Sequence, residues 1–261
     1  MGIYNCESTL QAALDSLYSQ SFQDIEIILF DDGSTDGTRK LAEENTVSHS
    51  NVRLLADTVN HGLSYALNQC LKIAEGEYIA RMDGDDWSLP NRFEKEVAFL
   101  DSHPEYAFVS CPIIYYRNGK EYMRGTTSKH EPSLLDFAVS SPFCHAPMMG
   151  RKTAFDAIGG YCEKWYCLQM EDYHLWMQFY QNNLKGYRLK EQLYVVRDED
   201  ASAGRRNFRR RVNETVVRWK ICRNFKLPLV YYRYCFQPLI LWALPRPIYR
   251  YLHKKRMLAH S

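Results

Sequence analysis

The sequence has few of the features that mark disulfide-rich, extended or membrane-spanning proteins. Its 261 residues include only 8 cysteines, well below the density of a disulfide scaffold. No secretory leader opens the chain, so we expect a reducing cytoplasmic compartment. An apolar content of 46% and a charged content of 25% exclude collagen-like and disordered classes. At this length the chain is one large domain, or one domain with an appendage.

The chain also lacks the glycine-rich loops of two common nucleotide-binding folds. Neither Gly-x-Gly-x-x-Gly nor Gly-x-x-x-x-Gly-Lys-Ser/Thr follows a predicted strand, which disfavours a Rossmann dinucleotide site and a P-loop. The cysteines do not give a closed zinc set either, because Cys162 and Cys167 are five residues apart and the others are scattered, apart from Cys144 beside His145. We interpret them as buried thiols that pack like small apolar side chains.

Acidic residues are nearly absent from the C-terminal part. Residues 204–261 carry 15 basic side chains and 1 acidic one, whereas residues 1–203 carry 18 basic and 30 acidic. We therefore divide the chain into a globular domain, 1–203, and a basic amphipathic helical tail, 204–261. Such a tail favours anionic lipid, nucleic acid or phosphate. Its apolar stretch, from Leu227 to Leu252, is interrupted by four prolines and contains Arg233 and Gln237. A spanning helix needs about 20 mostly apolar residues, so we expect the stretch to lie on a membrane instead. The alternative is a basic helix packed on the acidic domain.

Hydrophobic periodicity predicts strands that alternate with helices. The predicted strands are 25–30, 52–55, 78–82 and 107–111, and the predicted helices are 10–18, 35–44, 63–74, 92–100 and 171–182. This alternation indicates parallel βαβ units, in which ligands bind at the carboxyl ends of the strands. The turn-rich, aromatic residues from about 115 to 164 predict a smaller mixed sheet. The expected class is therefore α/β.

Acidic clusters follow two of the predicted strands. Asp31-Asp32 comes after the first, and Asp83-Gly84-Asp85-Asp86 after the third. Two such ends in one parallel sheet would meet at the same crevice. Magnesium or manganese binds one or two carboxylates together with substrate phosphates, so the pattern favours a metal that neutralises a phosphorylated leaving group. The alternative is a solvated acidic turn.

Eight short sequence blocks follow one another along the chain, and their order can be compared with that of known families. They are Ile3-Tyr4-Asn5, Gln20-Ser21-Phe22, Asp31-Asp32-Gly33-Ser34-Thr35-Asp36, Asn60-His61-Gly62, Gly76-Glu77-Tyr78-Ile79-Ala80, Asp83-Gly84-Asp85-Asp86, Gly159-Gly160-Tyr161 and Glu171-Asp172-Tyr173-His174-Leu175-Trp176. In order and spacing these blocks resemble the family 2 inverting glycosyltransferases with the GT-A fold, of the type that builds bacterial surface polysaccharides. The resemblance covers about residues 3–200.

The resemblance implies a GT-A fold with a Rossmann-like, mostly parallel nucleotide-binding half and a mixed sheet on the acceptor side. It implies that Tyr4, Asp32, Asp83 and Asp85 contact a nucleotide sugar, and that Asp85 and Asp86 hold Mn²⁺ or Mg²⁺. Relatives begin with a longer strand than Met1-Gly2-Ile3, so we expect the first strand to be largely missing.

The same resemblance implies that Asp172 is the catalytic base. The alternative role for Asp172 is stabilisation of a helix N-terminus, which is worth about 0.3–1 kcal/mol. His145 and Glu171 are candidate contacts for the acceptor or for phosphate, although His145 could equally be structural. Arg205 and Arg206 are further candidates, since arginine forks match phosphate oxygens.

Taken together, the sequence predicts a metal-dependent inverting glycosyltransferase. We expect it to move a sugar from a nucleoside diphosphate, uridine diphosphate by preference, to a polyprenyl-diphosphate-linked glycan at the inner face of the cell membrane, without nucleic acid. A sugar-nucleotide nucleotidyltransferase is disfavoured because its N-terminal glycine-rich loop is absent. The remaining alternative is a non-catalytic protein that binds membranes or nucleic acid through the basic tail.

Overall fold

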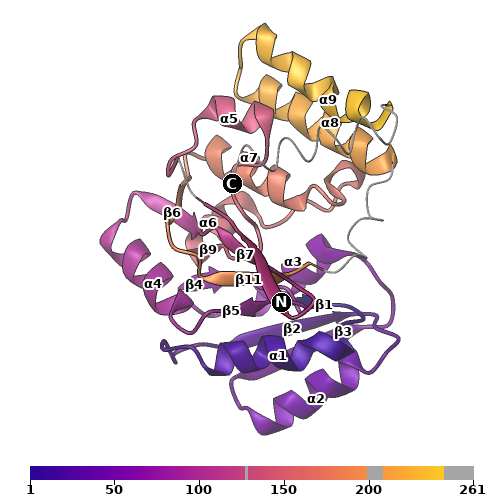
Figure 1. Ribbon diagram of the computed structural model, residues 1–261, viewed down its shortest axis with the longest axis vertical. Helices are drawn as coiled ribbons and strands as arrows, with labels where there is room; N and C mark the ends of the chain where they lie inside the picture. Colours follow the sequence, from indigo (N-terminus) through magenta and orange to yellow (C-terminus); the bar gives the residue numbers. More distant parts are fainter. Residues whose placement is uncertain (127–128, 199–207, 244–261) are drawn as a thin grey trace.

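The computed structural model describes residues 1–126, 129–198 and 208–243, and the statements below refer to these residues (Figure 1). The strands are β1 (Gly2–Ile3), β2 (Ile27–Asp32), β3 (Val52–Asp57), β4 (Tyr78–Ala80), β5 (Trp87–Ser88), β6 (Tyr106–Ser110), β7 (Ile113–Arg117), β8 (Lys120–Arg124), β9 (Met149–Arg151), β10 (Lys185–Arg188) and β11 (Tyr194–Arg197). The helices are α1 (Glu7–Tyr18), α2 (Thr38–Ser48), α3 (Leu63–Ile73), α4 (Arg92–Ser102), α5 (Leu134–Val139), α6 (Lys152–Ile158), η1 (Trp165–Cys167), α7 (Glu171–Gln181), α8 (Phe208–Asn224), η3 (Leu229–Tyr232) and α9 (Arg233–Ala243).

The N-terminal sheet is parallel and has the order β1-β2-β3. Its central strand β2 is buried along its whole length. Alternate side chains serve opposite faces: Ile27 and Leu29 pack with side chains of α1 and α2, and Ile28 and Phe30 pack with α3. A parallel strand covered by helices on both faces needs such a continuous apolar run, which explains why the sequence pattern located β2.

Two further four-stranded sheets continue the fold, in the orders β10-β6-β9-β4 and β5-β11-β7-β8. Both mix parallel and antiparallel pairs, which confirms the predicted mixed sheet. One expectation was wrong. β4 pairs antiparallel with β9, so the acidic clusters that follow β2 and β4 end strands of different hydrogen-bonded sheets. The pairing is non-local: β9 begins about seventy residues after β4, and hydrophobic periodicity does not report such a partner.

Helices α5, α7, α8 and α9 gather at the end of the molecule opposite α1 and α2 (Figure 1). Val217 and Ile221 of α8 are fully buried in the same apolar core as Trp176 of α7. Arg218 of α8 donates a hydrogen bond to the carbonyl oxygen of Ala138, at 3.2 Å. The described part of the basic tail is therefore packed on the rest of the protein. Within the described ranges, every helix is too short or too polar to cross a bilayer.

Candidate active site

The loop after β4 brings three carboxylates together. One oxygen each from Asp83, Asp85 and Asp86 lies within 4.8 Å of the others. Gly84 lets the loop pack closely against the N-terminal segment, because a Cβ at this position would come within 2.9 Å of the Cys6 sulfur. Thr9 of α1 also donates a hydrogen bond to the Gly84 carbonyl oxygen, at 3.0 Å. The loop is thus held against the start of the chain.

Strand β11 holds the other side of the acidic loop. The Arg197 amide donates to Asp86 at 2.9 Å, and the Tyr194 hydroxyl accepts from the Asp83 amide at 3.1 Å. Burial raises the pKa of Asp86 to about 7, with Asp83 and Asp85 adding like-charge repulsion. A divalent cation would relieve that repulsion, and carboxylate oxygens are the ligands that Mg²⁺ and Mn²⁺ prefer. The donor set therefore fits the predicted metal.

Arg81 supplies a protein counter-charge at this loop. Its buried guanidinium forms an ion pair with Asp83, which leaves Asp85 and Asp86 better suited to hold a cation. Sequence reasoning did not select Arg81. The signal was nevertheless visible, since an arginine in a run that reads as a buried strand, Tyr78 to Met82, needs a partner.

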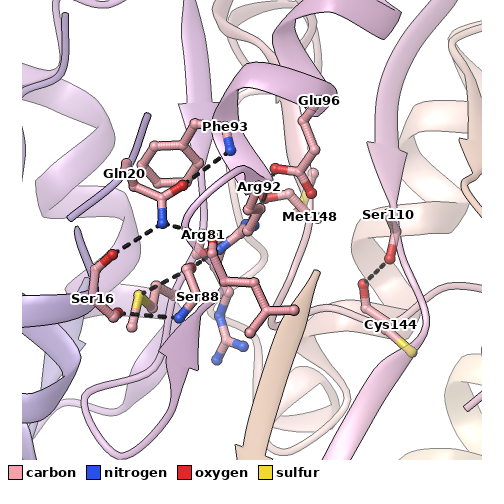
Figure 2. Close-up of polar contacts among 12 residues, drawn as sticks. Ser16, Gln20, Arg81, Ser88, Arg92, Phe93, Glu96, Ser110, Cys144 and Met148 are labelled. Carbon is pink, nitrogen blue, oxygen red and sulfur yellow. Dashed lines mark hydrogen bonds and ion pairs between the residues drawn. The ribbon is translucent and has the colours of Figure 1, made fainter. Parts of the chain in front are cut away.

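A second arginine, Arg92 at the start of α4, makes hydrogen bonds to residues that precede and follow the acidic loop. Its guanidinium is fully buried and donates to the carbonyl oxygen of Arg81 at 2.9 Å and to the Ser88 hydroxyl at 2.9 Å. Glu96, one turn later in α4, accepts from the Arg92 Nε at 3.1 Å. Figure 2 shows Arg81, Ser88, Arg92 and Glu96 close to one another.

The carboxylate of Asp32 holds a neighbouring loop. Its two oxygens accept hydrogen bonds from the amides of His61 and Gly62, at 2.8 and 2.7 Å. Tyr4, 48% exposed, precedes Asn5, whose side-chain oxygen accepts from the Thr35 amide at 2.8 Å. The loops that follow β1, β2 and β3 are therefore tied together on one side of the site.

Glu171 and Asp172 form the first turn of α7. The Ser141 hydroxyl donates to Asp172 at 3.2 Å and accepts from the Trp176 indole N–H at 3.1 Å. Burial raises the pKa of Asp172. It also raises the pKa of Glu171 to about 7, with the charge of Asp172 as the next contribution. Two adjacent carboxyl groups with raised pKa values are typical of general acid–base chemistry.

Charge interactions connect α7 to the acidic loop. The positive charge of Arg81 lowers the pKa of both Glu171 and Asp172, and the negative charge of Asp83 raises the pKa of Glu171. The Tyr161 hydroxyl, whose pKa is raised by burial, interacts with all four groups. It is also hydrogen-bonded to His145 at 2.9 Å, and the pKa of His145 is lowered by burial and by Arg81. His145 is therefore neutral and close to the site.

A pocket of about 560 Å³ lies beside these groups. The pocket is lined by the loop that Asp32 holds, by the segment that leads into α7 and by the basic tail. The lining residues are His61, Gly62, Leu63, Ser64, Tyr65, Cys162, Glu163, Lys164, Trp165, Leu168, Gln169, Glu171 and Arg210. Of the remaining predicted contacts, Arg205 and Arg206 lie outside the described residues.

The chain belongs to glycosyl transferase family 2, since the sequence pattern of that family matches residues 1–159. It is 39% identical over 260 residues to the protein named "Putative glycosyltransferase EpsE" of Bacillus subtilis (strain 168), covering 99% of this chain and 93% of that one. It is 29% identical over 182 residues to the UDP-Glc:alpha-D-GlcNAc-diphosphoundecaprenol beta-1,3-glucosyltransferase WfaP of Escherichia coli, covering 70% and 69%. The protein is thus a glycosyltransferase, as predicted.

Solved structures show the same fold. S. aureus TarS 1-349 in complex with UDP-GlcNAc matches with a TM-score of 0.72 at 19% identity, over 90% of this chain and 71% of that one. The mannosyltransferase PcManGT from Pyrobaculum calidifontis, in complex with GDP-Man and Mn²⁺, matches with a TM-score of 0.64 at 18% identity, over 100% and 79%. The predicted GT-A fold is confirmed.

The buried Arg92–Glu96 pair yields a stability prediction. Arg92→Met leaves the Glu96 carboxylate buried without its partner, and we expect it to lower the free energy of unfolding by about 3–5 kcal/mol. Arg92→Met/Glu96→Leu removes both charges and should recover most of that loss. The matched control is Arg39→Met, which breaks the exposed Arg39–Glu43 pair at the same helical spacing and should cost about 0.5 kcal/mol or less. Urea unfolding measures all three, and equal losses for Arg92→Met and Arg39→Met would contradict the prediction.

Proposed function

We propose that this glycosyltransferase transfers a sugar, with inversion, from a uridine diphosphate donor to a polyprenyl-diphosphate-linked glycan in polysaccharide biosynthesis. The observation that carries the proposal is the meeting of two acidic groups, Asp83–Asp86 and Glu171–Asp172, around Arg81. The donor is supported by the UDP-GlcNAc complex of TarS. The acceptor is supported by the name of WfaP, which specifies both UDP-Glc and a diphosphoundecaprenol-linked acceptor.

The acidic loop is the donor side of the proposed reaction. Asp85 and Asp86 would hold Mn²⁺ or Mg²⁺, which when bound offsets the charge that grows on a departing diphosphate. The Mn²⁺ complex of PcManGT supports this choice of metal. Asp83, already paired with Arg81, and Asp32 and Tyr4 would contact the ribose and the base. Both oxygens of Asp32 also hold the loop at His61 and Gly62, so Asp32 would orient that loop as well as the nucleotide.

The start of α7 is the acceptor side. Asp172 would take the proton from the acceptor hydroxyl as its oxygen attacks the anomeric carbon from the face opposite the diphosphate, and this geometry inverts the anomeric centre. The Ser141 hydroxyl, itself held by Trp176, keeps the Asp172 carboxylate in one orientation. Glu171 lines the pocket and would position the acceptor together with His145. A single base is sufficient, because no covalent sugar–enzyme intermediate forms.

The basic tail is the proposed membrane-facing surface. Its described part exposes large apolar side chains along α8, η3 and α9, namely Phe208, Trp219, Leu229, Val230, Phe236, Ile240 and Trp242. Exposed aromatic and aliphatic side chains next to lysine and arginine are typical of helices that lie in a membrane interface. Anionic lipid would add about 1 kcal/mol for each basic residue near the surface.

The metal assignment predicts the effect of Asp85→Ala/Asp86→Asn. Asparagine keeps an oxygen for the Arg197 amide, so the loop should stay folded while the cation is lost. Calorimetry with a UDP-sugar should show that Mn²⁺ no longer increases the affinity of the double variant for the sugar nucleotide. The loss should exceed the about 10–100-fold that is typical when a residue hydrogen-bonded to a metal ligand is changed. Asp24→Ala, which removes an exposed carboxylate between α1 and β2, is the control and should bind like the wild type. Manganese-dependent binding retained by the double variant would exclude this metal site.

The base assignment predicts a different pattern for Asp172→Asn. Donor affinity should be unchanged, while kcat falls by about 10²–10⁴-fold. Since burial raises the pKa of Asp172, the wild-type kcat should decline, as pH falls, at a higher pH than an exposed aspartate would give. Glu171→Gln is the matched control, because it neutralises the other carboxyl of the pair and should lose less turnover. Turnover retained by Asp172→Asn, with Glu171→Gln inactive, would assign the base to Glu171 instead.

The membrane surface predicts that Leu229→Asp/Val230→Asp weakens binding to anionic vesicles. Wild-type protein should sediment with phosphatidylglycerol vesicles more than with phosphatidylcholine vesicles, and less at high salt. Val47→Asp is the control, because Val47 of α2 is 89% exposed and Leu229 is 86% exposed. η3, which carries Leu229, packs on α8 and α9, and these helices lie at the opposite end of the molecule from α2 (Figure 1). Equal sedimentation of all three proteins would argue against a membrane role for this face.

A further inference from the structure

Two cysteines and a histidine outside the acidic loop come together beside α7. One ligand atom each from Cys162, Cys167 and His174 lies within 4.8 Å of the others. Cys162 follows the Gly159-Gly160-Tyr161 turn, Cys167 ends η1, and His174 lies in α7. Cys167 and His174 are buried, and Cys162 is partly exposed at the wall of the pocket.

The hydrogen bonds around His174 determine which ring nitrogen is available. Gln178 donates its side-chain N–H to the carbonyl oxygen of Ile158, at 3.1 Å, which directs its side-chain oxygen towards His174. That oxygen lies 2.8 Å from His174 Nδ1 and can only accept, so Nδ1 carries the proton. In a neutral ring, Nε2 then carries the lone pair that a metal ion can accept. Histidines that bind metals are commonly fixed in this way by a second hydrogen bond.

The two thiols supply the remaining ligands. Their sulfur atoms lie within 4.8 Å of each other and of a ring nitrogen of His174. Two sulfurs and one imidazole nitrogen form a soft donor set, unlike the oxygens of the acidic loop. Tetrahedral zinc has Zn–S bonds of about 2.3 Å and Zn–N bonds of about 2.0–2.1 Å. The three ligand atoms already lie within 4.8 Å of one another, so small side-chain movements would bring them to these bond lengths.

We propose that Cys162, Cys167 and His174 bind one Zn²⁺ ion, with the fourth coordination position open on the side of the pocket. Three protein ligands of the types Cys₂His and one open position form a known class of zinc site. The spacing of five residues between the cysteines, and the seven residues from Cys167 to His174, do not follow the usual short pattern. The short turn from η1 into α7 brings them together instead.

The bound ion would join the pocket wall to the helix that carries the proposed base. Asn213 of α8 already donates to the carbonyl oxygens of Trp165 and Leu168, at 3.3 and 3.0 Å, so the segment from Cys162 to Leu168 is held from outside by the tail. Zinc would hold the same segment from inside, to His174. Glu171 and Asp172 lie within one turn of His174, so zinc would fix the distance between the pocket wall and these carboxyl groups.

Cobalt spectroscopy tests the proposal directly. Full-length protein, reduced with a phosphine and freed of metal, is titrated with Co²⁺. Thiolate ligands give a sulfur-to-cobalt charge-transfer band that carboxylates cannot give, so the acidic loop does not contribute to this readout. We expect the band in the wild type and not in Cys162→Ser/Cys167→Ser. About one equivalent of Zn²⁺ should displace the cobalt and remove the band. Gln178→Leu should keep the band and weaken zinc affinity about 10–100-fold.

Cys222→Ser is the matched control. Cys222 and Cys235 are a second close thiol pair, with their sulfurs 3.7 Å apart in the core, and the variant should keep the band. Manganese-dependent donor binding by Cys162→Ser/Cys167→Ser shows that the variant is folded and that the donor site is separate. A wild type without a thiolate band, or a band that survives the double substitution, would overturn the proposal. So would reduced protein that reoxidises to a Cys162–Cys167 disulfide, two hydrogens lighter, without taking up Zn²⁺.

Discussion

The buried charge of Arg81 is the interaction on which the arrangement of the site depends. It pairs with Asp83 in the acidic loop and acts on Glu171 and Asp172 at the start of α7. Burial already raises the pKa values of Glu171 and Asp172. Without the guanidinium, their protonated forms, which cannot accept a proton, would be favoured further. A guanidinium remains charged at every physiological pH. The counter-charge is therefore permanent, whereas that of a metal ion is present only when the ion is bound.

Residues far apart in sequence hold the groups around Arg81. The acidic loop is fixed by Tyr194 and Arg197 of β11 and by Thr9 of α1, and Arg92 holds the Arg81 carbonyl oxygen from α4. Tyr194 and Arg92 are buried, Thr9 and Arg197 are partly buried, and all four are hydrogen-bonded, so they restrict the carboxylates to one geometry before a substrate arrives. A network of this kind is costly when one member is lost, since the remaining polar groups stay buried without partners.

The sequence predicted the elements well because their signals are local. The apolar run before Asp31 and the helical spacing of α3 and α7 predicted these elements to within a few residues, and the loops after β2 and β4 were recognisable by their turn-forming aspartates. The partners of those aspartates were not recognisable. Arg197 reaches Asp86 across about 110 positions, and β4 pairs with the distant β9. No periodicity or motif reports such contacts, so the supports of the site had to come from the structure.

The acidic loop and the Cys162–Cys167–His174 group differ in the ions that they can retain. Zinc binds nitrogen and sulfur ligands far more tightly than manganese does, so the Cys162–Cys167–His174 group would take zinc first and hold it without a substrate. The acidic loop offers only oxygens, and an ion there would depend on substrate phosphates for the rest of its coordination. The loop would then bind its metal together with the donor and release it with the nucleotide, while the thiolate group would keep its ion through every turnover. Ligand chemistry alone would in this way distinguish an ion that stays bound from one that exchanges with the nucleotide.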